Sequence, residues 1–146
     1  MKKIPRKKAV AVFALIVIVM PSIWAGIEYN KGSKRIVESN IVFQNDLHMA
    51  FEAITHYAES GEELQYRLFT AYMYAAYRAF PFTDYYQEDS SGFNYWQMSA
   101  AVQKIMEGFP TGHECSLLEK AMTALQDDWN NPHGYALLGF YASGAN

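Results

Sequence analysis

Residues 60–80 read SGEELQYRLFTAYMYAAYRAF, and this stretch decides the fold. Ser60 and Glu63 have the spacing of a capping box, so we predict a helix that begins there and ends at Phe80, before Pro81. Its apolar residues form two stripes on opposite sides, Leu64, Leu68, Ala71 and Ala75 on one and Tyr66, Phe69, Met73, Tyr77 and Phe80 on the other. A helix that is apolar on both sides is normally covered on both sides. We therefore expect this helix at the centre of a bundle.

Helical patterns continue on both sides of this stretch. Upstream, from about residue 33 to residue 59, apolar residues recur about every 3.5 positions and share one face, as in Ile36, Phe43, Leu47, Ala50, Ile54 and Tyr57. Downstream, residues 81–92 have the composition of a loop, and helices are predicted at about 93–108 and 113–129. Thr111 and Glu114 have the spacing of a second capping box, which would open the later of these two helices. Asn131 and Pro132 then predict the start of a short C-terminal helix.

These patterns predict an all-α protein. No strand-length alternating run and no internal repeat occurs in the sequence. We expect an N-terminal transmembrane or signal helix, followed by a bundle of four main helices and a short C-terminal helix. The predicted divisions are a membrane-targeting segment at residues 1–27, a linker at 28–34 and an extracytoplasmic helical domain at 35–146.

The N-terminal segment has the features of a membrane address. Residues 9–27 read AVAVFALIVIVMPSIWAGI and carry no charge, whereas five basic residues precede them, Lys2, Lys3, Arg6, Lys7 and Lys8. A helix of this length spans about 28 Å, close to the hydrocarbon thickness of a bilayer. The positive-inside rule keeps the basic end in the cytoplasm and predicts that the remaining chain lies across the membrane.

Two interpretations of this segment remain open. It is either a retained signal-anchor or a cleaved signal peptide with an apolar region at 9–20, the helix breaker Pro21 and a small residue at Ala25. Ile23 stands where cleavage favours a small residue, which supports the anchor. Both interpretations predict a domain outside the cytoplasm. It is attached by a single-pass helix in the first case, and it is periplasmic or secreted in the second.

The charge of the chain is unevenly distributed. Of 12 basic and 15 acidic residues, 7 basic and all 15 acidic ones lie from Glu28 onward, a net charge of −8 with histidine neutral. Such a domain repels phosphate backbones, so nucleic acid is not an expected partner. The charge favours a basic protein or another envelope component as partner.

Few residues form patterns that are specific to catalysis. Cys115 follows His113 closely, yet it also lies on the apolar stripe of Leu118 and Met122, so we interpret it as a packed cysteine rather than an intermolecular disulfide or a reactive thiol. Adjacent acids occur at Glu62-Glu63, Glu88-Asp89 and Asp127-Asp128. Acid–base catalysis needs two carboxyls that converge across a cleft, and adjacent acids point apart. We predict no catalytic residue and no cofactor.

One histidine pattern has the residue types of a metal site. His48, Glu52 and His56 recur every four residues along one ridge of the first bundle helix. Di-iron bundles instead use Glu-x-x-His on two helices, and no second copy occurs here. The three residues lie opposite the apolar stripe, so a solvated polar face is the preferred interpretation and no metal site is predicted.

The most informative stretch for function is residues 77–96. It holds the eight aromatic residues Tyr77, Phe80, Phe82, Tyr85, Tyr86, Phe93, Tyr95 and Trp96, with Asp84, Glu88 and Asp89 between them. Trp96 points about 160° away from Met98 on its predicted helix, so the core stripe does not account for it. The rings either plug the end of the bundle or form a binding surface ringed by acids. The predicted partner-binding residues are Phe82, Asp84, Tyr85, Tyr86, Glu88, Asp89 and Trp96.

The preferred functional hypothesis is a non-enzymatic interaction protein of the bacterial envelope. It would be an inhibitor, an immunity or exclusion factor, or an accessory subunit of a membrane complex, and it would bind a basic partner through the aromatic and acidic residues. One alternative is a small cell-envelope hydrolase that uses a carboxylate such as Asp84 or Glu88. Another is a structural subunit that assembles through its transmembrane helix.

Overall fold

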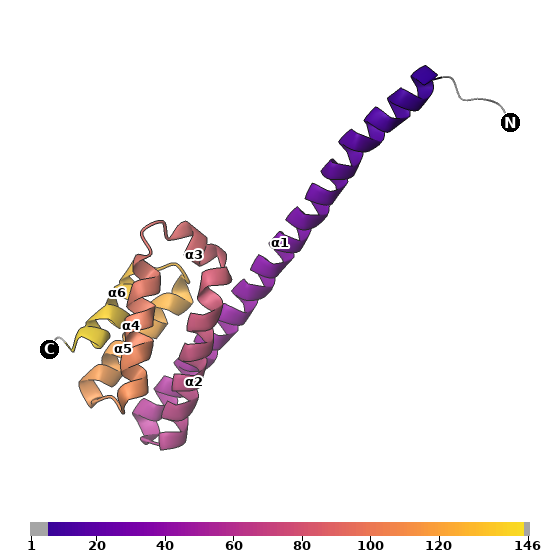
Figure 1. Ribbon diagram of the computed structural model, residues 1–146. Coiled ribbons are helices and arrows are strands. Elements are labelled where there is room, and N and C mark those ends of the chain that lie inside the picture. The colour runs from indigo at the N-terminus through magenta and orange to yellow at the C-terminus, as the bar shows by residue number, and fades with distance from the viewer. Residues whose placement is uncertain (1–5, 145–146) are drawn as a thin grey trace. The chain divides into compact units, whose positions relative to one another are not determined.

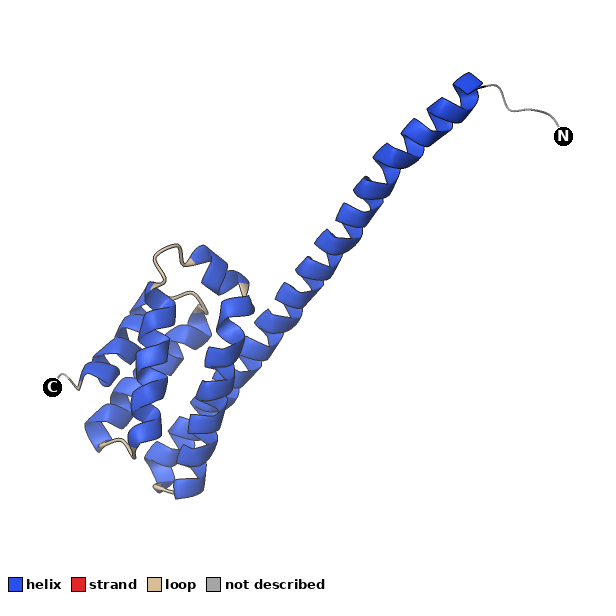
Figure 2. Cartoon of the chain, viewed as in Figure 1, coloured by secondary structure: helices blue, strands red, loops and turns tan. Residues whose placement is uncertain are grey.

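The computed structural model describes the backbone of residues 6–144 and the side chains of residues 28–144, and every regular element in these ranges is a helix (Figure 2). The elements are α1 (Arg6–Ser60), α2 (Glu63–Ala79), the 3₁₀ helix η1 (Phe80–Phe82), α3 (Asp84–Glu88), α4 (Phe93–Glu107), α5 (Gly112–Asp127) and α6 (Pro132–Ser143) (Figure 1). The prediction of an all-α bundle is confirmed.

The chain divides into two compact units, Met1–Arg35 and Ile36–Asn146. The first consists of helical backbone from Arg6 onward, and the helix continues through the polar stretch 28–34, where a linker was expected. Most residues of this stretch are compatible with a helix, and its one glycine, Gly32, costs only about 1 kcal/mol there. No helix among the residues with described side chains is long and apolar enough to cross a bilayer, and the predicted membrane segment 9–27 lies outside those residues.

The hydrophobic core lies in the second unit. From α1 it contains the predicted stripe of Phe43, Leu47, Ala50 and Ile54, which are fully buried. The largest buried side chains of the other helices are Phe69, Met73, Phe80, Met98, Ile105, Leu118, Met122, Tyr135 and Tyr141. Helix α6 packs against both α4 and α5, and the three helices lie side by side in Figure 1.

Helix α2 does not have the predicted central position. It buries only the face of Tyr66, Phe69 and Met73, whereas Leu64 on the opposite stripe is 62% exposed and Leu68 is 37% exposed. The opposite stripe stays exposed because α1 and α4 both pack against the same face of α2. The Tyr57 and Tyr66 rings join α1 to α2, and the Tyr77 and Tyr95 rings join α2 to α4.

The predicted helix starts are confirmed in two of three places. Thr111 and Glu114 form the reciprocal capping box of α5, and Asn131 caps α6 by accepting a hydrogen bond from the N–H of His133. The capping box predicted at Ser60 is wrong. Ser60 is instead the last residue of α1, and its hydroxyl donates to the carbonyl of His56.

The segment 81–92, predicted as a loop, contains η1 and α3. Thr83 nucleates this turn of helix, because its buried hydroxyl donates to the Phe80 carbonyl at 2.7 Å and accepts from the Tyr86 N–H at 3.2 Å. One threonine therefore ends η1 and caps α3. The helices are short because Asp89 and Gly92 follow closely with non-helical backbone.

Candidate functional site

Six of the seven predicted partner-binding residues lie in the connection between α2 and α4, at the end of the bundle where α3 is labelled, and Trp96 lies in the first turn of α4 (Figure 1). The structure separates them into residues that secure this connection to the bundle and residues whose side chains remain at the surface. The two interpretations of this stretch, a plug and a surface, therefore each describe a part of it.

Two of these residues secure the connection to helix α1. The Tyr85 ring is half-buried, packs 5.6 Å from the Phe43 ring, and its hydroxyl accepts a hydrogen bond from the Gln44 amide. Asp84 forms a pair of hydrogen bonds with Asn40: its carboxylate accepts from the side-chain amide and its N–H donates to the amide oxygen, each at 3.0 Å. These contacts fix α3 against the bundle.

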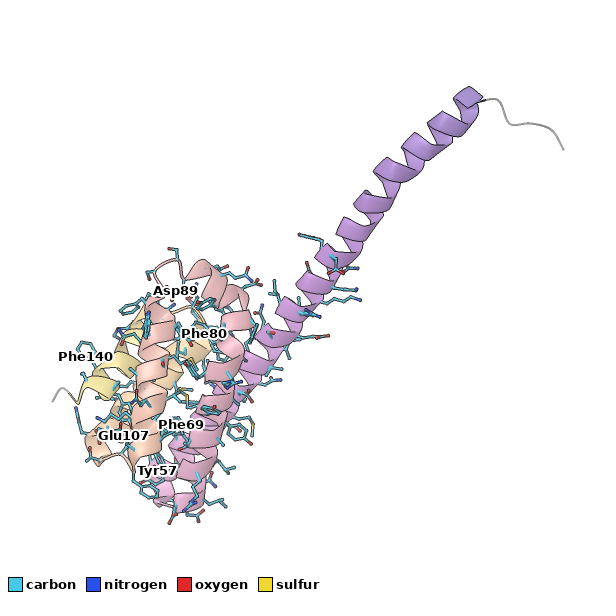
Figure 3. The ribbon with its side chains drawn as sticks, in the orientation of Figure 1. Tyr57, Phe69, Phe80, Asp89, Glu107 and Phe140 are labelled. Atoms are coloured by element: carbon cyan, nitrogen blue, oxygen red, sulfur yellow. The ribbon has the colours of Figure 1, made fainter. Side chains whose placement is uncertain are left out.

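Asp89 secures the start of α4 (Figure 3). Its carboxylate accepts from the backbone N–H groups of Phe93 at 3.2 Å and Asn94 at 2.7 Å, and from the Ser91 hydroxyl at 2.8 Å. Gly92, which precedes the helix, has φ of 67°, a left-handed conformation that glycine adopts at little cost. Asp89 thus accepts hydrogen bonds from N–H groups that have no partner within the helix, and its negative charge lies at the positive end of the helix dipole.

The remaining four predicted residues, together with the carboxylate of Asp84, are exposed. Phe82 is 66% exposed and Trp96 is 68% exposed, and Tyr86 is also exposed. The Tyr86 ring meets the Tyr95 ring edge to face at 5.5 Å, and Tyr95 meets Trp96 at 6.2 Å. We call Phe82, Asp84, Tyr86, Glu88 and Trp96 the aromatic-acidic surface. The carboxylates of Asp84 and Glu88 are exposed within it, and Glu88 accepts a hydrogen bond from Asn130 at 3.0 Å.

Two partly buried tyrosines, Tyr77 and Tyr95, adjoin this surface through the contacts of Tyr95 with Tyr86 and Trp96. Tyr77 and Tyr95 stack at 5.4 Å, and their hydroxyl oxygens are 2.9 Å apart. The Ser99 hydroxyl donates to Tyr77 at 3.4 Å, and these hydrogen bonds lower the pKa of Tyr77, whereas the bond to Tyr77 raises the pKa of Tyr95. The stacked pair holds Tyr95 in place against Tyr86 and Trp96.

Sequence reasoning missed a second polar cluster, which joins three helices. Lys104 on α4 pairs with Glu114 on α5 at 2.7 Å and donates to the Tyr141 carbonyl of α6 at 2.7 Å. Hydrogen bonds from Lys104 and from the Thr111 backbone lower the pKa of Glu114 to about 2. The hydroxyl of Tyr66 bonds the carbonyls of Ile105 and Gly108 nearby. Only the tertiary fold brings Lys104 to Glu114, so no local spacing in the sequence signals the pair.

The candidate catalytic groups do not converge. Cys115 is only 7% exposed, and burial, together with the carboxylates of Glu119 and Glu114, raises the pKa of its thiol. The predicted packed cysteine is confirmed, and such a thiol is a poor nucleophile. Burial raises the pKa of Asp46, but Asp46 lines none of the three clefts found among the described residues.

The histidine ridge of α1 faces solvent, as predicted. His48, Glu52 and His56 are all exposed. The His48 ring lies 3.6 Å from the Glu52 carboxylate through Nε2 and 2.8 Å from the Gln126 amide through Nδ1. Among the residues whose side chains are described, no group of three potential ligands has the arrangement of a metal site.

Comparison of the chain with protein-family models, with curated proteins and with solved structures finds no match.

Proposed function

We propose that this chain is a non-enzymatic binding protein of the bacterial envelope, which holds a basic partner protein through the aromatic-acidic surface. The observation that carries the proposal is the exposure of Trp96 and Phe82, at 68% and 66%, beside the exposed carboxylates of Asp84 and Glu88. Large exposed aromatic rings surrounded by charged residues are typical of hot spots in protein–protein interfaces.

The charge of the domain supports a basic partner. Residues 36–146 contain 4 basic and 14 acidic residues, a net charge of −10 with histidine neutral. Two of the four cations are already paired, because Arg67 bonds Glu63 and Lys104 bonds Glu114. A field of this sign accelerates the encounter with a cationic protein and weakens as salt is added.

The hydrolase alternative has less support from the site. Asp84 and Glu88 each accept a hydrogen bond from an asparagine amide, and both lie at an exposed surface instead of in a cleft. A glycosidase-type acid needs a carboxyl that burial keeps protonated. The geometry therefore favours binding over hydrolysis.

The proposal is tested with the double variant Phe82→Ala/Trp96→Ala. The tagged full-length chain would be purified from its membrane fraction, and the partner that accompanies it would be identified and quantified by mass spectrometry. We expect at least about a tenfold loss of that partner, because two exposed rings carry most of the contact. Raising the salt concentration should release the partner from the native chain.

Leu64→Ala provides the matched control, since Leu64 is also a large apolar side chain, 62% exposed, and lies on a different helix. This control should retain the partner. A double variant that keeps its circular dichroism spectrum and retains the partner would contradict the proposal.

A further inference from the structure

Helices α4 and α6 form a groove that the predicted site residues do not include. It has a volume of about 420 Å³ and is lined by Phe93, Gln97, Ala136, Gly139, Phe140 and Ser143. Phe93 is 41% exposed and Phe140 is 58% exposed, so the two helices each present a ring at the groove (Figure 3 labels Phe140). Cavities of about 300–1,000 Å³ with mostly apolar walls are typical of binding sites for small groups.

The Gln97 side chain lies directly against the backbone of Gly139. A Cβ atom at position 139 would come within 1.7 Å of Oε1 of Gln97, so only glycine leaves room for the amide there. Gln97 is half-buried, and within residues 28–144 its amide makes no hydrogen bond. The groove therefore offers a donor and an acceptor between apolar walls, as a site for a polypeptide segment requires.

The groove adjoins the aromatic-acidic surface. Phe93 and Trp96 are three residues apart on α4 and therefore lie on neighbouring parts of its outer face. Carboxylates gather where α4 and α6 begin. Asp89 caps α4, and the charges of Asp89 and Asp128 add to the effect of burial in raising the pKa of Tyr135 on α6. The nearest cation on α4, Lys104, is paired with Glu114.

We propose that this groove is the anchor pocket for the basic partner and receives one aromatic side chain flanked by lysine or arginine. The inference rests on the proposed function and names the chemistry of the segment that is bound. The ring of the partner packs between Phe93 and Phe140, and its main chain bonds the Gln97 amide. The flanking cations face the carboxylates at the starts of α4 and α6.

The test uses three pentapeptide probes with the ¹⁵N-labelled full-length chain in detergent micelles. The probes are Lys-Lys-Trp-Lys-Lys, Lys-Lys-Ala-Lys-Lys and Glu-Glu-Trp-Glu-Glu, each with blocked ends. We expect the first peptide to shift the NMR signals of the Gln97 side-chain amide and the Gly139 N–H. The other two peptides should bind at least about tenfold more weakly, because the alanine peptide lacks the ring and the glutamate peptide has the opposite charge. Equal binding of all three peptides, or no shift at Gln97 and Gly139, would overturn the inference.

The variant Gly139→Ala disturbs the groove with little effect on the fold. The three atoms nearest to its new methyl all belong to the amide of Gln97, a flexible side-chain end that must move away, and alanine is a better helix former than glycine. It should therefore lose binding of the tryptophan peptide. Gly112→Ala is the matched control, since a Cβ there has no neighbour within 4 Å, and it should bind the peptide normally.

The same variants separate this inference from the proposed function. A partner that is lost from Phe82→Ala/Trp96→Ala but retained by Gly139→Ala overturns the anchor pocket and leaves the binding function standing. A partner retained by both overturns the two together. Loss from both, with normal retention by Gly112→Ala, supports the pocket.

Discussion

The hydroxyl of Tyr66 joins α2 to the C-terminal end of α4. It lies 2.8 Å from the Ile105 carbonyl and 2.6 Å from the Gly108 carbonyl, both at the end of α4, where helix carbonyls have no partner within the helix. Burial raises the pKa of Tyr66 to about 12, so the hydroxyl keeps its proton at any physiological pH. The donor is therefore always present.

Replacing Tyr66 with phenylalanine should lower the free energy of unfolding by about 1–2 kcal/mol, because the buried carbonyl of Ile105 and the partly buried carbonyl of Gly108 lose their donor while the ring remains packed. Urea denaturation followed by circular dichroism measures the change. Tyr74→Phe on the same helix is the control, since Tyr74 is 44% exposed and should change the stability little. Equal effects of the two variants would refute the role of the hydroxyl.

Glu114 gives the chain a pH dependence with a definite sign. Its pKa is lowered from an ordinary value of 4.5 to about 2, so its pairing with Lys104 stabilises the fold fully above pH 4.5. This contribution is lost as the pH falls from about 4.5 towards 2. Glu114→Gln should therefore reduce the stability by about 1–2 kcal/mol at pH 7 and by progressively less towards pH 2.

The measurement is the difference in unfolding free energy between the native chain and Glu114→Gln at several pH values. Glu119→Gln on the same helix removes a carboxylate for which no salt bridge is described, and it should not produce this pH dependence. A difference for Glu114→Gln that stays constant from pH 7 to pH 3 would argue against the ion pair as its source.

The start of helix α4 depends on Asp89, a residue that precedes the helix. Asp89→Ala removes an acceptor from the Phe93 and Asn94 N–H groups and should cost about 1–2 kcal/mol of stability. Thermal unfolding measures this loss. Asp127→Ala, which removes an exposed carboxylate, should change the stability by less than about 0.5 kcal/mol. Equal losses of stability from Asp89→Ala and Asp127→Ala would contradict the role of Asp89 as the cap of α4.

Helix periodicity was sufficient to predict most elements of the bundle. The stripe of Phe43, Leu47 and Ile54, and the caps of α5 and α6, depend on neighbours within one or two turns, and such neighbours are visible in the sequence. The position of α2 was not predictable in this way. Leu64 and Leu68 repeat with the period of a buried stripe, and only the placement of α1 and α4 leaves them exposed.

The candidate site was predicted as a list of residues, but their separate tasks were not. Asp89, Tyr85 and Trp96 all belong to the same aromatic and acidic stretch of the sequence. Asp89 nevertheless accepts hydrogen bonds from the Phe93 and Asn94 N–H groups, and Tyr85 accepts one from Gln44, so these two stabilise the fold. The groove at Gln97 was missed for a related reason. Its space depends on a glycine of α6 that faces α4, and a single glycine in a helix carries no such information in the sequence.

At the scale of the whole molecule, the uncharged run 9–27 behind five basic residues leads us to expect a chain delivered across the cytoplasmic membrane. Fractionation followed by mass measurement of the N-terminus tests this address. A retained anchor predicts an intact chain that resists alkaline extraction from membranes, and a cleaved peptide predicts a mature chain that begins after about Ala25. Intact chain in the cytosol would contradict both.

Because Cys115 is buried, its alkylation can report local unfolding of the protein. The sequence contains a single cysteine, and its sulfur-bearing side chain is 7% exposed on α5. Iodoacetamide can therefore alkylate it at an appreciable rate only while α5 is transiently detached from its neighbours. The labelling rate in native buffer, divided by the rate in denaturant, gives the population of that opened state without any added probe. Occupation of the groove beside α6 should slow the labelling, since α6 packs on α5.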